Sequence, residues 1–311
     1  MLSERADKLV IQEKSITSKL EMEAEVLRKK LTDGTVQPKR EGNKQNLFKL
    51  VRASTVTKDI FPPEWLIDEL VPEEGLFELF GEPGSLKSFI VQDMCYAIAT
   101  GIKWHSKDVK QGNVTYIVGE GGNGIRKRFR ALELEYSIED YPLYLSEFPM
   151  DLMNPDSCEA VATAIKENMG DCSLLVIDTL HRNATGSEDS SEDFSKILQN
   201  LDIYFRSVTK AVLWVHHTGH SSKERSRGSS AKFGALDASF KTERGTELKN
   251  RVTLSNNKQK DAEEAPNIYF DAMVKDLGVV DNKLRPITTL VLKEVDGVKM
   301  NKNKIMMIEA R

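Results

Sequence analysis

The chain has 311 residues, of which 44 are Lys or Arg and 48 are Asp or Glu, giving a formal net charge of −4 at pH 7. This length fits one α/β domain of about 200 to 250 residues with an appendage. No stretch reaches the roughly 18 uninterrupted apolar residues of a membrane span, and the charged N-terminus does not resemble a secretory signal. The three cysteines are scattered, without the spacing of a zinc or redox site. We therefore expect a cytoplasmic protein that makes no membrane contact and carries no uniformly basic coat for nucleic acid.

Residues 1–45 are rich in charge and are predicted to form a helical extension and linker ahead of a domain over residues 46–311. Apolar side chains recur in this extension at steps of three or four, as on one face of a helix: Ile16, Leu20, Ala24, Leu27 and Leu31. Such a face needs a partner surface. That surface is either the chain's own domain or another protein, such as a second subunit or a replication partner.

Residues 47–72 form a connecting segment that is expected to pack against the core. Strands and helices then alternate. The predicted strands are 76–80, 114–119, 143–147, 173–178 and 211–217, and the predicted helices are 87–100, 124–135, 157–169 and 190–208. Continuous apolar runs such as 174–177 are typical of strands buried on both faces, so the pattern predicts an α/β fold with a mostly parallel central sheet.

After residue 218 the helices give way to strands, predicted at 235–242, 250–256, 267–273, 287–294 and 304–309. Strands that follow one another without helices favour antiparallel pairing. The C-terminal strands are therefore expected to extend one edge of the sheet in antiparallel fashion.

The first core strand leads into the loop Gly81-Glu82-Pro83-Gly84-Ser85-Leu86-Lys87-Ser88, which opens the helix 87–100. This is the pattern of a phosphate-binding loop: backbone N–H groups surround the phosphates of ATP, Lys87 neutralises the β and γ oxygens, and the Ser88 hydroxyl reaches Mg²⁺. A Gly/Pro/Ser turn that matches by chance is the other interpretation. One position departs from the pattern, because Leu86 stands where glycine is expected, and leucine disfavours positive φ and crowds a phosphate.

Acidic residues follow two further core strands, at the edge where ligands of open α/β sheets bind. Glu120 comes after strand 114–119 and is the candidate general base that activates the attacking water, unless it is a loop or cap residue. Asp178 ends the apolar strand 173–178 and is the candidate Walker B ligand of Mg²⁺ or of its water.

Strand 211–217 ends in two adjacent histidines, of which His217 is the candidate sensor of the γ-phosphate. A zinc site with His216 is the competing interpretation. Adjacent residues of a strand point to opposite faces, and no Cys or Asp stands at ligand spacing, so the sequence favours the sensor.

Two basic features follow. The segment 219–232 combines small residues with cations, which suits contact with nucleic-acid phosphates, although an exposed loop without a ligand has the same composition. The candidate DNA-contacting residues are Lys223, Arg225, Arg227, Ser229, Ser230 and Lys232. Later, Lys258 and Lys260 face the same side at the end of a strand and are candidates for action on a neighbouring subunit.

The ordered set GEPGSLKS, YIVGEGG, LLVIDT, VLWVHHTGH, RGSSAKFGALDAS and KQKD resembles the RepA-type branch of the RecA/DnaB-like hexameric helicase ATPases of plasmids and bacteriophages, over about residues 60–295. The resemblance implies a RecA-like P-loop NTPase core that binds ATP and Mg²⁺. It also implies a homo-oligomeric ring, a hexamer, in the cytoplasm of a bacterium or of a phage-infected host. The leucine at position 86 departs from the usual glycine of the family.

The resemblance also assigns roles to the candidate residues. It implies catalytic roles for Glu120, Lys87, His217, Lys258 and Lys260, nucleotide contact by Gly81 to Ser88, metal contact by Ser88 and Asp178, and single-stranded DNA contact by the loop of about Lys223 to Lys232. The two late lysines would reach the nucleotide of the neighbouring subunit and supply the role of an arginine finger.

The expected function is therefore that of an ATP-dependent DNA helicase or translocase that acts on single-stranded DNA in replication. Two alternatives stay open. One is a RecA-like DNA-binding protein of recombination or annealing, which uses ATP without unwinding. The other is a nucleotide-binding scaffold or helicase-loading partner in which Leu86 has slowed hydrolysis.

Overall fold

The computed structural model describes residues 50–58, 62–119, 122–186, 190–218, 230–246 and 248–297. The chain divides into two units, Met1–Phe61 and Pro62–Arg311. The described part of the first unit contains the short helix α2 (Ala53–Val56). The predicted extension of residues 1–45, its boundary and the predicted strand 304–309 lie outside the described residues.

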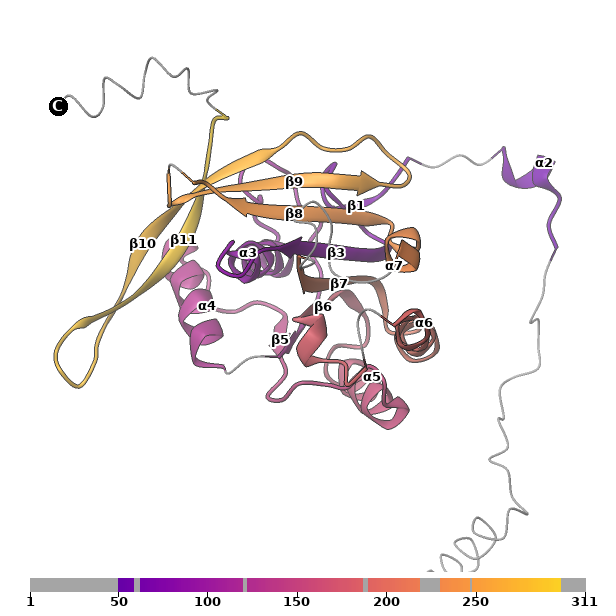
Figure 1. The fold of residues 1–311 in the computed structure, drawn as a ribbon, viewed down its shortest axis with the longest axis horizontal. Coiled ribbons are helices and arrows are strands. Elements are labelled where there is room, and N and C mark those ends of the chain that lie inside the picture. The colour runs from indigo at the N-terminus through magenta and orange to yellow at the C-terminus, as the bar shows by residue number, and fades with distance from the viewer. Residues whose placement is uncertain are drawn as a thin grey trace, which may run out of the picture. The chain divides into compact units, whose positions relative to one another are not determined.

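The second unit is built on a sheet whose nine strands, counted over the described residues, follow the order β11-β10-β9-β8-β3-β7-β6-β4-β5. Six strands pair in parallel, and Figure 1 shows most of them stacked edge-on: β3 (Gly75–Gly81), β4 (Val114–Val118), β5 (Leu143–Leu145), β6 (Cys172–Asp178), β7 (Thr209–His217) and β8 (Ala238–Arg244). Three antiparallel strands extend one edge: β9 (Arg251–Gln259), β10 (Ile268–Val280) and β11 (Pro286–Val295). The predicted mostly parallel α/β core with antiparallel C-terminal strands is confirmed.

Helices cover both faces of this sheet (Figure 1). α3 (Lys87–Thr100) and α4 (Asn123–Tyr136) lie on one face, and α5 (Pro155–Met169) and α6 (Ser191–Asn200) lie on the other. The apolar run of β6 divides between them: Leu174 and Val176 belong to the core under α3, whereas Leu175 and Ile177 belong to the core under α5 and α6. This alternation explains why the run is continuously apolar.

Local sequence determines where two of these helices begin. Asn154 caps α5 by accepting a hydrogen bond from the Asp156 N–H, and proline follows at the first helical position, where its missing N–H costs nothing. Ser190 caps α6 in the same way through the Asp193 N–H. None of the helices in the described ranges is long and apolar enough to cross a membrane.

Two features differ from the sequence-based expectation. β8 was expected among the antiparallel strands but pairs in parallel with β3, and the connection to it includes α7 (Ser230–Ala235), a helix that was not predicted. A parallel neighbour requires such a crossover. The expected helix 190–208 is the shorter α6 followed by a π-helical turn, Leu201–Phe205.

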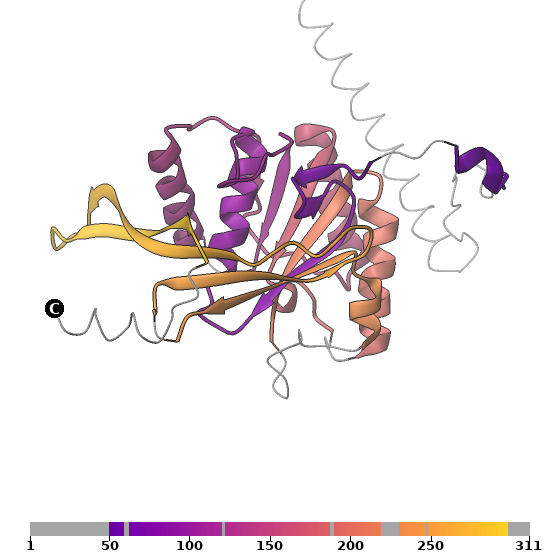
Figure 2. The ribbon, with the colours of Figure 1, turned by 90° about the horizontal axis from the view of Figure 1, so that it is seen from above.

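Short pairings complete the second unit. The segment expected to connect to the core forms a two-stranded antiparallel ribbon, β1 (Trp65–Ile67) and β2 (Val71–Pro72). At the other end of the unit, β10 and β11 form a long hairpin that extends beyond the rest of the sheet (Figures 1 and 2). Glu135 of α4 pairs with Lys275 and Lys293 of this hairpin and so fixes its base to the domain.

Candidate nucleotide-binding site

The register of the sheet gathers several predicted site residues at one edge. Gly81, the last residue of β3, is in register with His217 of β7 and with Thr242 of β8. On the other side of β7, Asp178 ends β6 in register with Val118 of β4. The carboxyl ends of the parallel strands therefore lie together on one side of the domain, as expected for a ligand site of an open α/β sheet.

Lys87 begins α3 and folds back over the loop that precedes it. Its Nζ donates hydrogen bonds to the carbonyl oxygens of Gly81, at 3.0 Å, and Glu82, at 2.9 Å, and the residue is only 6% exposed. A phosphate oxygen carries a full negative charge and is a stronger acceptor than a carbonyl. The ammonium group is thus placed where it can exchange these carbonyls for phosphate.

The start of the loop is closed by a contact with β8. Ser85 Oγ and Thr242 Oγ1 lie 2.9 Å apart in a hydrogen bond that is buried. A Cβ atom on Gly81 would meet the carbonyl oxygen of Thr242 at 2.4 Å, so only glycine fits at this position beside β8. Thr242 is a site residue that sequence reasoning missed, because no local pattern marks it.

Leu86 adopts the conformation for which the family pattern provides a glycine. It stands just before α3 with φ of 64° and ψ of 26°, in the left-handed region, and its side chain packs partly against the core. For an L-residue this conformation costs about 1–2 kcal/mol. The loop therefore holds a leucine in a conformation that leucine disfavours.

We expect Leu86→Gly to raise ATP turnover, because it removes a side chain from the phosphate loop. The relieved strain is offset by lost packing and by the greater freedom of glycine in the unfolded chain, so the free energy of unfolding should change by less than about 1 kcal/mol. Steady-state hydrolysis and denaturant unfolding measure the two effects. Leu86→Ala is the matched control, because it removes the bulk and keeps the Cβ; equal turnover in all three proteins would contradict crowding by Leu86.

Asp178 lies at the end of β6 in a buried cluster of hydrogen-bonded polar side chains. It is 7% exposed, and its Oδ2 accepts a short hydrogen bond from the Tyr116 hydroxyl, which in turn accepts one from Gln92 Nε2 at 3.2 Å. Burial, followed by the charge of Asp178, raises the pKa of Tyr116 well above its usual value. Tyr116 therefore stays a donor and orients the carboxylate; sequence reasoning missed it because it is one apolar-looking position within a strand.

The donor set suits Mg²⁺. Asp178 offers carboxylate oxygen and Ser88, in the first turn of α3, offers a hydroxyl, and Mg²⁺ prefers oxygen ligands with few from the protein and the rest from phosphate and water. Among the described residues, no three His, Cys, Asp or Glu side chains gather in a group that could hold a metal by themselves. Ser88 and Asp178 could thus hold a Mg²⁺ whose other ligands come from phosphate and water.

His217 lies beside the start of the phosphate loop. It is half-buried and in register with Gly81, and the next residue, Thr218, donates its backbone N–H to the Gly81 carbonyl at 3.3 Å. His216 is buried, and its Nδ1 lies 2.8 Å from the His217 carbonyl oxygen. The position of His217 is compatible with contact to a phosphate bound by the loop.

A family match covers the phosphate loop and the parallel strands β3 to β7. The chain matches the family described as AAA domain over residues 43–223, which is more than half of its length. The chain belongs to this family. Its core is thus a P-loop ATPase domain. No curated protein matches the chain. Among solved structures it is similar to the crystal structure of the RadB recombinase, with 13% sequence identity and a TM-score of 0.46, over 64% of this chain and 87% of that chain.

Several predicted site residues lie outside the described residues. These are Glu120 and the loop residues Lys223, Arg225, Arg227 and Ser229, whereas Ser230 is the first residue of α7. Lys232 is placed differently from the prediction. It is 2% exposed, and its Nζ lies 3.0 Å from Glu78 Oε2 of β3, so in this structure its ammonium group is paired inside the protein and is not presented to DNA.

The two late lysines come after the family-matched segment 43–223 and lie at the opposite end of the parallel strands from the phosphate loop. β9 runs antiparallel to β8, so Lys258 is in register with Ser239 near the start of β8, and the Lys260 N–H bonds to the Asp237 carbonyl. From Asp237 to Thr242 is five strand positions, or about 17 Å along the sheet. Lys260 therefore stands far from the phosphate loop of its own chain.

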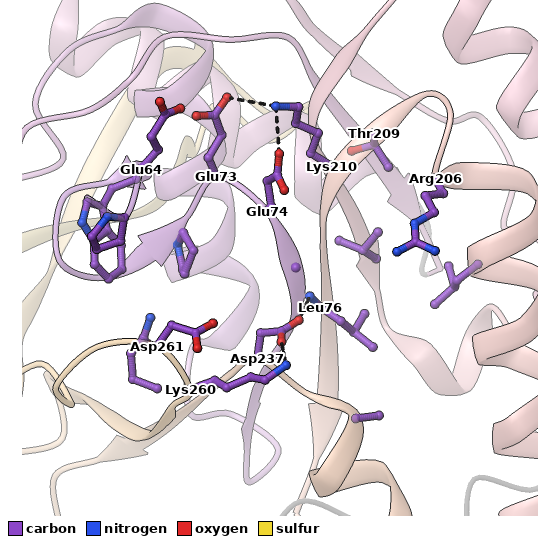
Figure 3. A pocket seen from close by; sticks show the side chains of 18 of the residues that line it. Glu64, Glu73, Glu74, Leu76, Arg206, Thr209, Lys210, Asp237, Lys260 and Asp261 are labelled. Carbon is purple, nitrogen blue, oxygen red and sulfur yellow. Dashed lines mark hydrogen bonds and ion pairs between the residues drawn. The ribbon is translucent and has the colours of Figure 1, made fainter. Parts of the chain in front are cut away.

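A cavity of about 990 Å³ opens at this same end of the strands (Figure 3). Its apolar wall includes Leu76, Leu201 and Phe205, and charged side chains point into it from several elements. The residues labelled in Figure 3 are Glu64, Glu73, Glu74, Leu76, Arg206, Thr209, Lys210, Asp237, Lys260 and Asp261. The cavity lies away from the phosphate loop of this chain, and Lys260 is one of its lining residues.

Proposed function

We propose that the chain is an ATP-dependent DNA helicase or translocase that acts on single-stranded DNA in replication as a ring of identical subunits. The observation that carries this proposal is the distance between the phosphate loop and the two late lysines. The phosphate loop with Lys87 lies at the carboxyl ends of the parallel strands, and Lys258 and Lys260 lie at their amino ends. Subunits arranged head to tail would bring these two ends of the strands together, and head-to-tail contacts form a ring when the rotation between subunits closes.

In this proposal each residue does one part of phosphoryl transfer. Lys87 would neutralise charge on the β and γ oxygens, Ser88 and Asp178 would hold Mg²⁺, and Glu120 would position the attacking water. Mg²⁺ supplies further neutralisation of the phosphates when the nucleotide is bound. His217 would contact the γ-phosphate, and the lysines of the next subunit would stabilise the transferring group as arginine fingers do.

DNA would act through the segment that follows β7. This segment starts after Thr218, whose N–H is bonded to Gly81 at the start of the phosphate loop, and it carries Lys223, Arg225 and Arg227. Cations of this kind contact backbone phosphates without reading the base sequence. The covalent connection to the phosphate-loop edge supports a coupling of DNA contact to hydrolysis.

The test is ATP hydrolysis by the purified protein with and without single-stranded DNA, at 50 and 200 mM salt. Turnover is expected to rise with DNA. Because each neutralised phosphate releases a counterion, the DNA concentration needed for half-maximal stimulation should rise steeply with salt, by about 10-fold or more for three to four contacts. Glu120→Gln is the control that should remove turnover and keep nucleotide binding. If DNA does not change ATP turnover at either salt concentration, the helicase or translocase function is ruled out.

Two other functions remain candidates. A recombination or annealing protein would show the same DNA-stimulated turnover, and a strand-displacement assay distinguishes it because it would not unwind a forked duplex. A scaffold or helicase-loading partner is favoured by the strained Leu86, whose bulk in the phosphate loop would slow hydrolysis. Brisk turnover by the wild-type protein argues against that role.

A further inference from the structure

Both late lysines are bound by one short segment of their own chain, which runs from α7 to the start of β8. Lys258 Nζ donates to the Phe233 carbonyl at 2.7 Å and lies 4.9 Å from the centre of the Phe233 ring. Lys260 Nζ donates to Asp237 Oδ1 at 3.1 Å. Neither ammonium group is therefore directed freely away from the subunit.

Asp237 is the fixed member of its pair. Its Oδ2 accepts the Leu76 N–H at 2.9 Å, and its own N–H donates to the Leu76 carbonyl at 2.8 Å. A Cβ on Gly75 would lie 2.7 Å from Oδ2, which shows how closely the carboxylate packs against the start of β3. The carboxylate cannot follow a moving partner.

Lys260 is the movable member. Its side chain is 61% exposed, compared with 28% for the side chain of Asp237, and Figure 3 shows Lys260 extending toward the carboxylate. The hydrogen bond and charge of Asp237 raise the pKa of Lys260. An exposed pair of this kind opens at little cost. A nucleoside triphosphate carries several negative charges, whereas Asp237 carries one. The triphosphate would therefore compete with Asp237 for the ammonium group of Lys260.

We propose that Asp237 is a positioning residue that withholds Lys260 from the nucleotide of the neighbouring subunit. This inference rests on the proposed function, in which Lys260 acts across a subunit contact. The carboxylate holds the lysine against its own chain, and the lysine leaves only when a triphosphate is presented to it. Asp237 thus opposes hydrolysis in the resting assembly.

The same segment gives DNA a way to act on the lysines. α7 follows residues 219–229 directly in the sequence, and the segment from Ser230 to Asp237 carries the acceptors of both lysines. A displacement of α7 on DNA contact would draw the Phe233 carbonyl and Lys258 with it. Lys260, two residues further along the chain, would then separate from Asp237, which stays bonded to Leu76. Release of Lys260 by DNA would account for stimulated turnover.

The experiment compares the full-length wild-type protein with Asp237→Asn. Asparagine keeps an oxygen for the Leu76 N–H and removes the charge that holds Lys260. Turnover without DNA is expected to rise about two- to fivefold, the range set by an exposed ion pair, while DNA-saturated turnover stays the same. The ratio of DNA-saturated turnover to DNA-free turnover should therefore fall by the same factor. Equal DNA-free turnover in the two proteins overturns the inference.

Two further variants separate this inference from the function on which it rests. If Lys260→Ala leaves turnover unchanged, the role of Lys260 across subunits fails. If Lys260→Ala lowers turnover and Asp237→Asn does not raise it, only the withholding role of Asp237 fails. The double variant should match Lys260→Ala, because Asp237 acts through the lysine. A separate loss in the double variant would mean that Asp237 is merely structural.

A direct readout follows the lysine itself. Acetylation of surface amines, followed by mass spectrometry, should modify Lys260 faster in Asp237→Asn than in wild type, because the unpaired amine loses its proton more readily. Lys258, which contacts Phe233 instead, is the internal control and should react at the same rate in both proteins. Equal rates at Lys260 would show that the pair does not restrain it in solution and would overturn the inference.

Discussion

Lys87→Ala is expected to lower ATP turnover by at least about 100-fold, the usual cost of removing one preorganised charge from a transition state. In the structure the ammonium group is already gathered into the loop by the Gly81 and Glu82 carbonyls, so little rearrangement separates it from a bound phosphate. Alanine leaves the developing charge on the γ-phosphate without this partner. Steady-state hydrolysis with saturating ATP and Mg²⁺ measures the loss.

Lys166→Ala is the matched control for this variant. Lys166 is an exposed lysine of α5, so its loss changes the net charge equally and leaves the loop intact. Turnover in this control should equal that of the wild type. Near-normal hydrolysis by Lys87→Ala would mean that the loop does not serve catalysis, and the assignment of the site would have to be abandoned.

Gly81→Ala is expected to destabilise the domain by about 1–3 kcal/mol, as overpacking of a rigid core does. The added methyl would meet Thr242 at two points, the carbonyl oxygen at 2.4 Å and Oγ1 at 2.6 Å, and Ser85 Oγ at 2.7 Å. The first is backbone of a paired strand, so it cannot rotate aside. Relief requires β3 and β8 to separate, which also disturbs the bond between Ser85 and Thr242.

Denaturant unfolding of Gly81→Ala and wild type gives the change in free energy directly. Gly122→Ala is the control, because a Cβ there meets nothing within 4 Å and the φ of −62° suits alanine. Its stability should stay within about 0.5 kcal/mol of the wild type. An undiminished stability of Gly81→Ala would show that the loop and β8 are not as closely joined as the structure has them.

The parts of the fold that were predicted correctly depend on neighbours in the sequence. The limits of α3, Lys87–Thr100, coincide with the prediction, since the loop before the helix and Gly101 after it are local signals. The apolar run of β6 predicted a strand buried on both faces for the same reason. Hydrophobic periodicity and turn residues are sufficient to predict a helix or strand where no contact with a distant part of the chain determines the structure.

The parts that were missed depend on distant pairing. β8 becomes parallel because it joins β3, a strand more than 150 residues earlier, and no local pattern records that choice. The bonds of Tyr116 to Asp178 and of Ser85 to Thr242 span 62 and 157 residues. Lys232 was interpreted as an exposed cation because its partner, Glu78, is equally remote. Burial of a charged pair is visible only once the chain has folded.

The pair of Glu78 and Lys232 also has an evolutionary consequence. The carboxylate is fully buried in β3, where Ser239 Oγ donates a further hydrogen bond to it, and the ammonium group is its ionic partner. Loss of either charge alone removes the ionic partner of a buried charge and is destabilising, whereas an apolar replacement of both can be tolerated. In related sequences these two positions should therefore change together or not at all, so their covariation would trace the descent of this core among homologues.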